Sequence, residues 1–273
     1  MSEKASIFGS ESNLLGILNL PQERHAKGLG VILMNAGMLS RTGPNRLNVK
    51  IARRLAELGI PSIRIDFSGL GDSAYASETA ELDLQRSREL GAAMDLLGKE
   101  AQVNRFVLIG ICSGGWDALM TADKDRRVVG LTNLEGIGLR NSRYVWRRMM
   151  DPGKWWRTLT GRGHAIQRLL KGKSKENGAK TLEVERGNGG ADLESQIGRM
   201  LERGVRMLFC YREGNEIRYA YRLKRNGERI RATNVPQGMR VEFIPEADHT
   251  FTLLSSQHRL MAVLEDWLEA FPR

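Results

Sequence analysis

The residues with the clearest chemical potential lie in one short stretch, FVLIGICSGGWDA at positions 106–118. Four apolar residues lead into Gly110, and the spacing after Ser113 is helical, so the stretch predicts a buried strand, a sharp turn and a helix. Gly110 and Gly114 stand two positions either side of Cys112, where a tight nucleophile turn has no room for side chains. Ser113 lacks this spacing, because an isoleucine stands two positions before it. The pattern therefore points to Cys112 as the nucleophile.

A thiol at the start of a helix is favoured in its ionised form. The amide groups and the dipole of the helix point at it, which lowers its pKa and prepares it for attack on an acyl carbon. A buried structural cysteine in an ordinary strand-to-helix turn would show the same short motif. The rest of the chain must therefore supply the context that separates the two interpretations.

The elements that would hold this turn alternate between strands and helices. From residue 29 to 134, continuous apolar runs alternate with amphipathic patterns, which is typical of a parallel sheet covered on both sides. Strands are predicted at 5–8, 14–18, within 27–35, 62–67, 106–109, 128–134, 205–211 and 240–244. Helices are predicted at 44–59, 80–98, after residue 112, at 191–203 and 216–224, and at the end of the chain.

These features resemble the α/β-hydrolase fold family, with cysteine in place of the usual serine. The run NAGMLSRTGPNRLNVKIARRLAELGIPSIRIDFSGLGDS (35–73) is similar to serine-aminopeptidase-like hydrolases, including those associated with bacterial exopolysaccharide and exosortase loci. The resemblance implies an α/β fold with a mostly parallel sheet of about eight strands, helices on both faces and a helical cap insertion. It also implies that Gly37 contacts substrate and that the backbone amides of Met38 and Ser113 form the oxyanion hole.

The resemblance further implies partners for the thiol. The segment PEADHTF (245–251) is similar to the catalytic-histidine loop of the family, which makes His249 the general base and acid. Asn215 stands where the family usually carries its acid. A thiol ionises near neutral pH, so an amide that orients the histidine can suffice, with Glu216 or Glu213 as fallback acids. The opposing interpretation is that two departures from Ser-His-Asp mark a protein that binds but no longer turns over.

A basic segment interrupts the periodic core. Between positions 140 and 186 there are thirteen Lys or Arg and four Asp or Glu, an excess of nine positive charges. This segment resembles the cap that α/β-hydrolases insert after the sixth strand. The resemblance divides the chain into a first core part (1–137), a basic helical cap (138–190) and a second core part (191–273). Trp146 and Trp155 within it are expected to bind substrate. Clustered Trp and Arg would also fit an anionic ligand or an anionic membrane surface, whereas the tryptophans could simply pack the cap onto the core.

Length and composition set the remaining bounds. A chain of 273 residues with net charge +10 fits one large domain with an insertion. The two cysteines sit in separate apolar runs, so neither a disulfide framework nor a metal cluster is expected, and no cofactor. The sequence begins without a secretory signal pattern and has no apolar run long enough to span a bilayer, which predicts a cytoplasmic protein, membrane-peripheral if the cap binds lipid. No nucleic-acid module accompanies the basic segment, so nucleic acid is not expected as a partner.

The sequence therefore predicts a cysteine-dependent hydrolase that cleaves an ester or thioester through an acyl-enzyme on Cys112. Its expected substrate is a small-molecule or lipid-like acyl compound. Acyl transfer to an acceptor other than water would use the same intermediate, and a non-catalytic protein that binds an anionic ligand is the alternative from another class.

Overall fold

The computed structural model describes residues 1–23, 28–77, 81–136, 190–212, 224–225, 228–229 and 236–272. Within these ranges the strands are β1 (Ser2–Phe8), β2 (Leu14–Leu20), β3 (Leu29–Leu33), β4 (Ser62–Asp66), β5 (Arg105–Ile111), β6 (Val128–Leu134), β7 (Arg206–Arg212), β8 (Lys224–Arg225), β9 (Glu228–Arg229) and β10 (Met239–Ile244). The helices are the short 3-10 helix η1 (Pro44–Arg46), α1 (Leu47–Glu57), α2 (Leu82–Ala101), α3 (Ser113–Lys124), α7 (Gly190–Glu202) and α8 (Leu254–Glu269).

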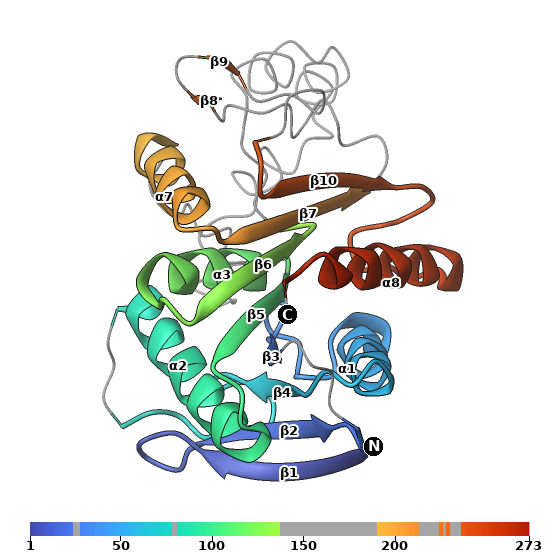
Figure 1. Ribbon diagram of the computed structural model, residues 1–273. Helices are drawn as coiled ribbons and strands as arrows, with labels where there is room; N and C mark the ends of the chain where they lie inside the picture. The colour runs from blue at the N-terminus through green and yellow to red at the C-terminus, as the bar shows by residue number, and fades with distance from the viewer. Residues whose placement is uncertain are drawn as a thin grey trace, which may run out of the picture.

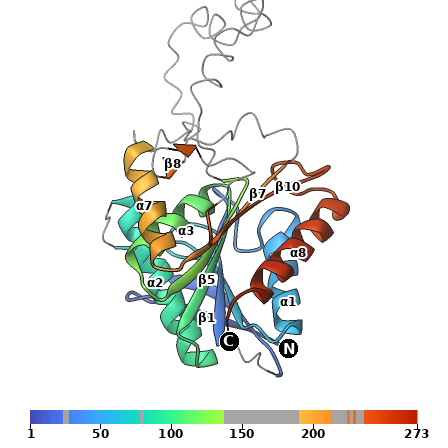
Figure 2. The same ribbon diagram turned by 45° about the horizontal axis from the view of Figure 1, so that its top comes forward.

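Eight strands form one twisted sheet in the order β1-β2-β4-β3-β5-β6-β7-β10 (Figures 1 and 2). β1, β2 and β4 are joined by antiparallel pairing, and every other pair in the sheet is parallel. All five residues of β3 and all five of β4 are buried, as expected for parallel strands covered on both faces. The predicted α/β class, with about eight mostly parallel strands, is confirmed.

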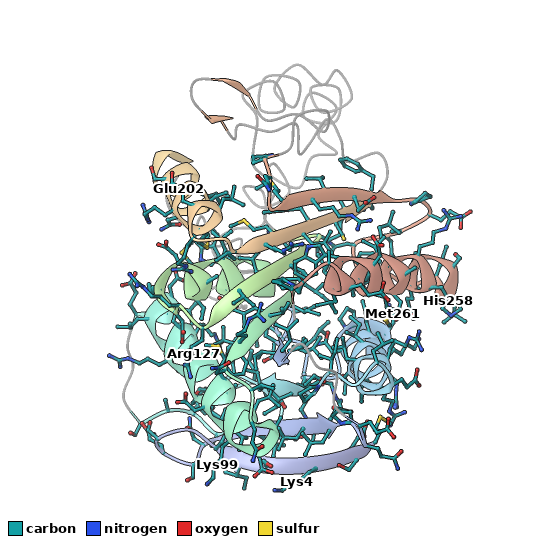
Figure 3. All side chains as sticks on the ribbon, viewed as in Figure 1. Lys4, Lys99, Arg127, Glu202, His258 and Met261 are labelled. Atoms are coloured by element: carbon teal, nitrogen blue, oxygen red, sulfur yellow. The ribbon has the colours of Figure 1, made fainter. Side chains whose placement is uncertain are left out.

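Helices cover both faces of the sheet. α2, α3 and α7 lie on one face, where their apolar residues pack with residues of the strands, for example Leu90, Leu119 and Ile197 (Figure 1). α1 and α8 lie on the other face and contribute Ile51 and Leu264 to a second apolar cluster. Figure 3 shows the labelled His258 on the outer side of α8, so this histidine belongs to the helix surface.

Two predicted segments fall almost entirely outside the described residues. The helix predicted at 216–224 lies outside the described residues except at its last position, and there it is wrong, because Lys224 begins the short strand β8. The predicted cap at 138–190 lies outside the described residues apart from Gly190, with which α7 begins.

The parallel strands bring their carboxyl ends to one edge of the sheet, the usual location of sites in open α/β sheets. β3, β5, β6, β7 and β10 are consecutive neighbours. The residues that follow them along the chain therefore converge, although the segments are far apart in sequence.

Candidate active site

Cys112 sits on a strained turn between β5 and α3. Its backbone has φ 55° and ψ −118°, a conformation that L-residues rarely adopt and that costs on the order of 1–3 kcal/mol. The backbone is held on both sides, since Cys112 N–H donates to the Leu134 carbonyl (2.9 Å) and Gly115 N–H donates to the Cys112 carbonyl (3.1 Å). The predicted sequence of strand, sharp turn and helix is confirmed.

The glycine spacing has a direct steric cause. A Cβ at Gly110 would collide with the backbone of Gly114 and Gly115. A Cβ at Gly136, beyond the end of β6, would lie 2.5 Å from the Cys112 carbonyl oxygen. The turn can therefore pack this closely only because these positions lack side chains.

His249 follows β10 and faces Cys112. The imidazole hydrogen-bonds to the Cys112 sulfur, and this contact is the largest cause of a pKa of Cys112 that lies below the ordinary thiol value. Burial opposes the shift, whereas the charge of the imidazolium and the Ser113 N–H reinforce it. The same contact, followed by the one with Glu135, raises the pKa of His249 to about 9. The contact thus favours the charged form of each side chain, the thiolate of Cys112 and the imidazolium of His249.

Glu135, at the end of β6, is the acid that faces the histidine among the described residues. Its Oε2 accepts a hydrogen bond from His249 Nδ1 at 3.4 Å, so Nε2 is the ring nitrogen left for the thiol. The Glu135 side chain is fully buried. Its Oε1 accepts the Arg212 N–H from the end of β7, and the Arg212 Nε lies 3.9 Å from Oε2.

These contacts stabilise the negative charge of Glu135. Burial by itself raises the pKa of a carboxyl group, but the hydrogen bonds from His249 and from the Arg212 backbone, together with the Arg212 charge, leave the pKa of Glu135 below its ordinary value. The Glu135 backbone adopts φ 51°, and its N–H donates to the Cys210 carbonyl at 2.9 Å. An ionised carboxylate therefore stands behind the imidazole, in the place that a triad needs.

The loop that carries His249 is fixed by its neighbours. Asp248 Oδ1 accepts the N–H groups of Thr250 (3.1 Å) and Thr252 (2.8 Å), which shapes the turn. The Asn45 amide, from η1 after β3, donates to the Thr250 carbonyl at 3.1 Å. Asn45 itself has φ 51°, a left-handed conformation that asparagine tolerates better than most residues.

The segment after β3 contacts the start of α3, next to Cys112. We call residues 34–43 the β3 loop. Gly37, at φ 59°, donates its N–H to the Ser113 Oγ at 2.8 Å, which ties the loop to the first turn of α3. Met38, the next residue, is 81% exposed. The structure thus brings Gly37 and Ser113 together, while the oxyanion-hole role of the Met38 and Ser113 amides stays a prediction.

Several predicted site residues are not described. Asn215, Glu216 and Glu213, and likewise Trp146 and Trp155, lie outside the described residues. Within the part of the chain that the structure describes, no group of three His, Cys, Asp or Glu side chains could hold a metal ion. None of the described helices has the length and apolar character that a bilayer crossing requires.

The sequence analysis does not identify Glu135, because it places the acid of the triad after β7. The signal that could have found it is an acidic residue directly following a buried strand, in NLEG at 133–136, next to a small residue. Since β6 neighbours both β5 and β7, its end is close enough to a histidine loop after β10 to supply the acid.

Comparisons with known proteins agree with this geometry at the level of the fold. No protein-family model and no curated protein matches the sequence. Among solved structures, the chain is similar to dienelactone hydrolase from Anabaena variabilis, with 18% identity, coverage of 100% of this chain and 99% of that chain, and a TM-score of 0.57. An esterase domain from a Rhodothermus marinus protein matches with 17% identity, 99% coverage of both chains and a TM-score of 0.59.

A third similar structure is proline iminopeptidase from Mycobacterium smegmatis, with 15% identity, 98% coverage of both chains and a TM-score of 0.59. The matches extend over almost the whole of each chain. At these identities they establish the α/β-hydrolase fold of this chain and nothing finer.

Proposed function

We propose that this protein is a cysteine-dependent hydrolase that cleaves an ester or thioester through an acyl-enzyme on Cys112. The observation that carries the proposal is the connected set of thiol, imidazole and buried carboxylate, with the pKa of Cys112 lowered and that of His249 raised. A purely structural cysteine needs no such partners. The fully buried Cys210 is an example within the same chain, because burial raises the pKa of its thiol.

In the proposed reaction, the Cys112 thiolate attacks the acyl carbon and forms the C–S bond, while the electron pair of the carbonyl moves to its oxygen. The amides of Ser113 and Met38 hold that oxyanion. When the tetrahedral intermediate collapses, the bond to the leaving group breaks and the His249 imidazolium gives its proton to the departing alkoxide or thiolate. His249 then takes a proton from water, the hydroxide attacks the thioester, and the acid product and the Cys112 thiolate are released.

Glu135 has two roles in this scheme. It fixes the Nδ1–H tautomer of His249, and its negative charge stabilises the imidazolium that both steps require. A carboxylate in this position also weakens the alternative that the chain is a degenerate hydrolase, because the nucleophile, base and acid are all present. Asn215 remains a candidate second partner of His249. The narrower resemblance to serine-aminopeptidase-like hydrolases is part of the proposal.

The test is the intact mass of the protein after brief exposure to p-nitrophenyl acetate and to a small acyl thioester. We expect an acyl adduct on the wild type that is absent from Cys112→Ala and slow to form on His249→Ala. Cys210→Ala is the matched control and should acylate like the wild type, since Cys210 is fully buried. Acylation of Cys112→Ala to the same extent would refute the assignment of the nucleophile.

The decay of the adduct decides between hydrolysis and transfer. Loss of the acyl group in water alone supports a hydrolase. An adduct that is stable in water and lost on addition of an alcohol or amine would instead identify an acyltransferase that uses the same intermediate.

A further inference from the structure

The β3 loop is held by a buried acidic residue that the mechanism above does not use. Asp66, the last residue of β4, is fully buried and lies next to β3 in the sheet. Its Oδ1 accepts the Arg41 N–H at 2.5 Å and the Asn35 side-chain amide at 3.0 Å. Its Oδ2 accepts the Arg41 guanidinium and the Asp72 N–H, the latter at 3.1 Å. Every one of these donors belongs to the β3 loop or to the turn after β4.

Arg41 completes the connection. Besides Asp66, its guanidinium contacts the Asp72 carboxylate at 2.7 Å. The turn that carries Asp72 packs tightly against Asp66, since a Cβ at Gly71 would collide with the Asp66 carboxylate. One side chain of the β3 loop therefore bridges two carboxylates at the end of the neighbouring strand.

The other side of the β3 loop is tied to the nucleophile turn through Gly37 and Ser113. The Asn35 side chain adds two hydrogen bonds. Its amide donates to the Leu39 carbonyl within the loop at 2.6 Å, and its Oδ1 accepts the N–H of Phe67, which follows β4, at 2.8 Å. Apolar packing contributes little at the tip, where Met38 is 81% and Leu39 45% exposed. Hydrogen bonds and ion pairs therefore determine the position of the β3-loop backbone.

We propose that Arg41 is a positioning residue for the oxyanion hole, because its bridge between Asp66 and Asp72 fixes the β3 loop, which includes Met38 and is hydrogen-bonded through Gly37 to Ser113, the residue next to Cys112. This role rests on the acyl-enzyme chemistry proposed above. A buried ion pair is a poor source of net stability, since desolvation offsets much of its attraction, but it is well able to specify one geometry.

An alternative role for Arg41 is to bind an anionic substrate. The contacts argue against it, since two carboxylates already neutralise the guanidinium and the Arg41 side chain is only 18% exposed. A guanidinium is needed here because its planar fork reaches two carboxylates at once. The single ammonium of lysine cannot reproduce that geometry.

The test compares two reactions of the same sulfur. Acylation by p-nitrophenyl acetate passes through an oxyanion, whereas alkylation by iodoacetamide does not. Arg41→Lys keeps the positive charge beside buried Asp66 but loses the bridge. Because a displacement of about 1 Å can cost about 100-fold in rate, we expect acylation to slow by about 10- to 100-fold while alkylation stays within about twofold of the wild type.

A second variant makes a smaller change at an exposed side chain, so it tests the proposal even if Arg41→Lys misfolds. Asp72→Asn removes only the outer half of the bridge, at a side chain that is 67% exposed, and should slow acylation in the same direction by a smaller factor. The matched control is Asp95→Asn, because Asp95 is 69% exposed and also accepts from an arginine, Arg127, at 2.5 Å. Arg127, labelled in Figure 3, directly precedes β6, whereas Cys112 directly follows the parallel strand β5, so the two lie at opposite ends of these strands. The control should change neither reaction.

Amide hydrogen exchange supplies a readout that does not depend on activity. Arg41→Lys should speed exchange of residues 35–41, with α3 and α8 unchanged. Unchanged acylation and exchange would overturn the proposal, and so would an equal fall in acylation and alkylation. A wild type that is never acylated would refute the proposed function, and the exchange result would then decide on its own whether Arg41 fixes the loop.

Discussion

Replacing Glu135 by glutamine removes one negative charge behind His249 and keeps the size of the side chain. A carboxamide oxygen can still accept the Arg212 N–H, so the connection to β7 survives. The other amide position is then an NH2 donor that faces His249 Nδ1–H, so the change removes both the negative charge and the hydrogen bond that Oε2 accepts, and both losses disfavour the imidazolium.

The size of the effect follows from the geometry. Two unit charges 3.4 Å apart interact by about 5 kcal/mol at an effective dielectric constant of about 20. The His249 side chain is 49% exposed, so solvent screening reduces this to about 1–2 kcal/mol. At about 1.4 kcal/mol per pKa unit, the pKa of His249 should fall by about one unit from its value of about 9. The direction is downward because the imidazolium loses the charge that favours it.

The assay is an NMR titration of the histidine imidazoles, with the His249 signals identified by their absence from His249→Ala. Glu89→Gln is the matched control. Glu89 is also a buried carboxylate that accepts a backbone N–H, from Ser68 at 3.1 Å, and an arginine, Arg86, at 3.3 Å. We expect the pKa of His249 to be unchanged in this control.

An unchanged pKa of His249 in a folded Glu135→Gln protein would refute the reasoning. Another group would then support the imidazole, and Asn215→Ala would be the next variant to titrate. A fall in both Glu135→Gln and Glu89→Gln would also contradict it, because the effect would then come from the overall charge.

Two further predictions concern the backbone around the site. Gly110→Ala should lower the free energy of unfolding by about 1–3 kcal/mol or more in urea denaturation, because the added methyl group meets the backbone of Gly114. Gly198→Ala, where nothing lies within 4 Å, should be neutral or stabilising, and equal losses would contradict the steric argument. Asn45→Gly keeps the left-handed backbone but loses the bond to Thr250, so acylation should slow by about two- to fivefold, and an unchanged rate would show that this bond does not position His249.

The sequence by itself determined the nucleophile turn and most of the sheet. Apolar runs separated by amphipathic helices predicted the parallel strands, and β6 begins and ends at the predicted residues, Val128 and Leu134. Gly110 identified the turn because the backbone crowding there is local and comes from Gly114 and Gly115, four and five residues along the chain. Such local constraints leave a signature that spacing alone can reveal.

Only the tertiary structure placed Glu135 behind His249 and Asp66 beneath the β3 loop. Glu135 and His249 are 114 residues apart, and they meet because the ends of β6, β7 and β10 are neighbours in the sheet. Hydrogen bonds between such distant residues impose no spacing on the sequence, and an acid can be supplied from the end of more than one strand. Local geometry therefore determines the position of the nucleophile. The order of the strands determines which carboxylate supports the histidine.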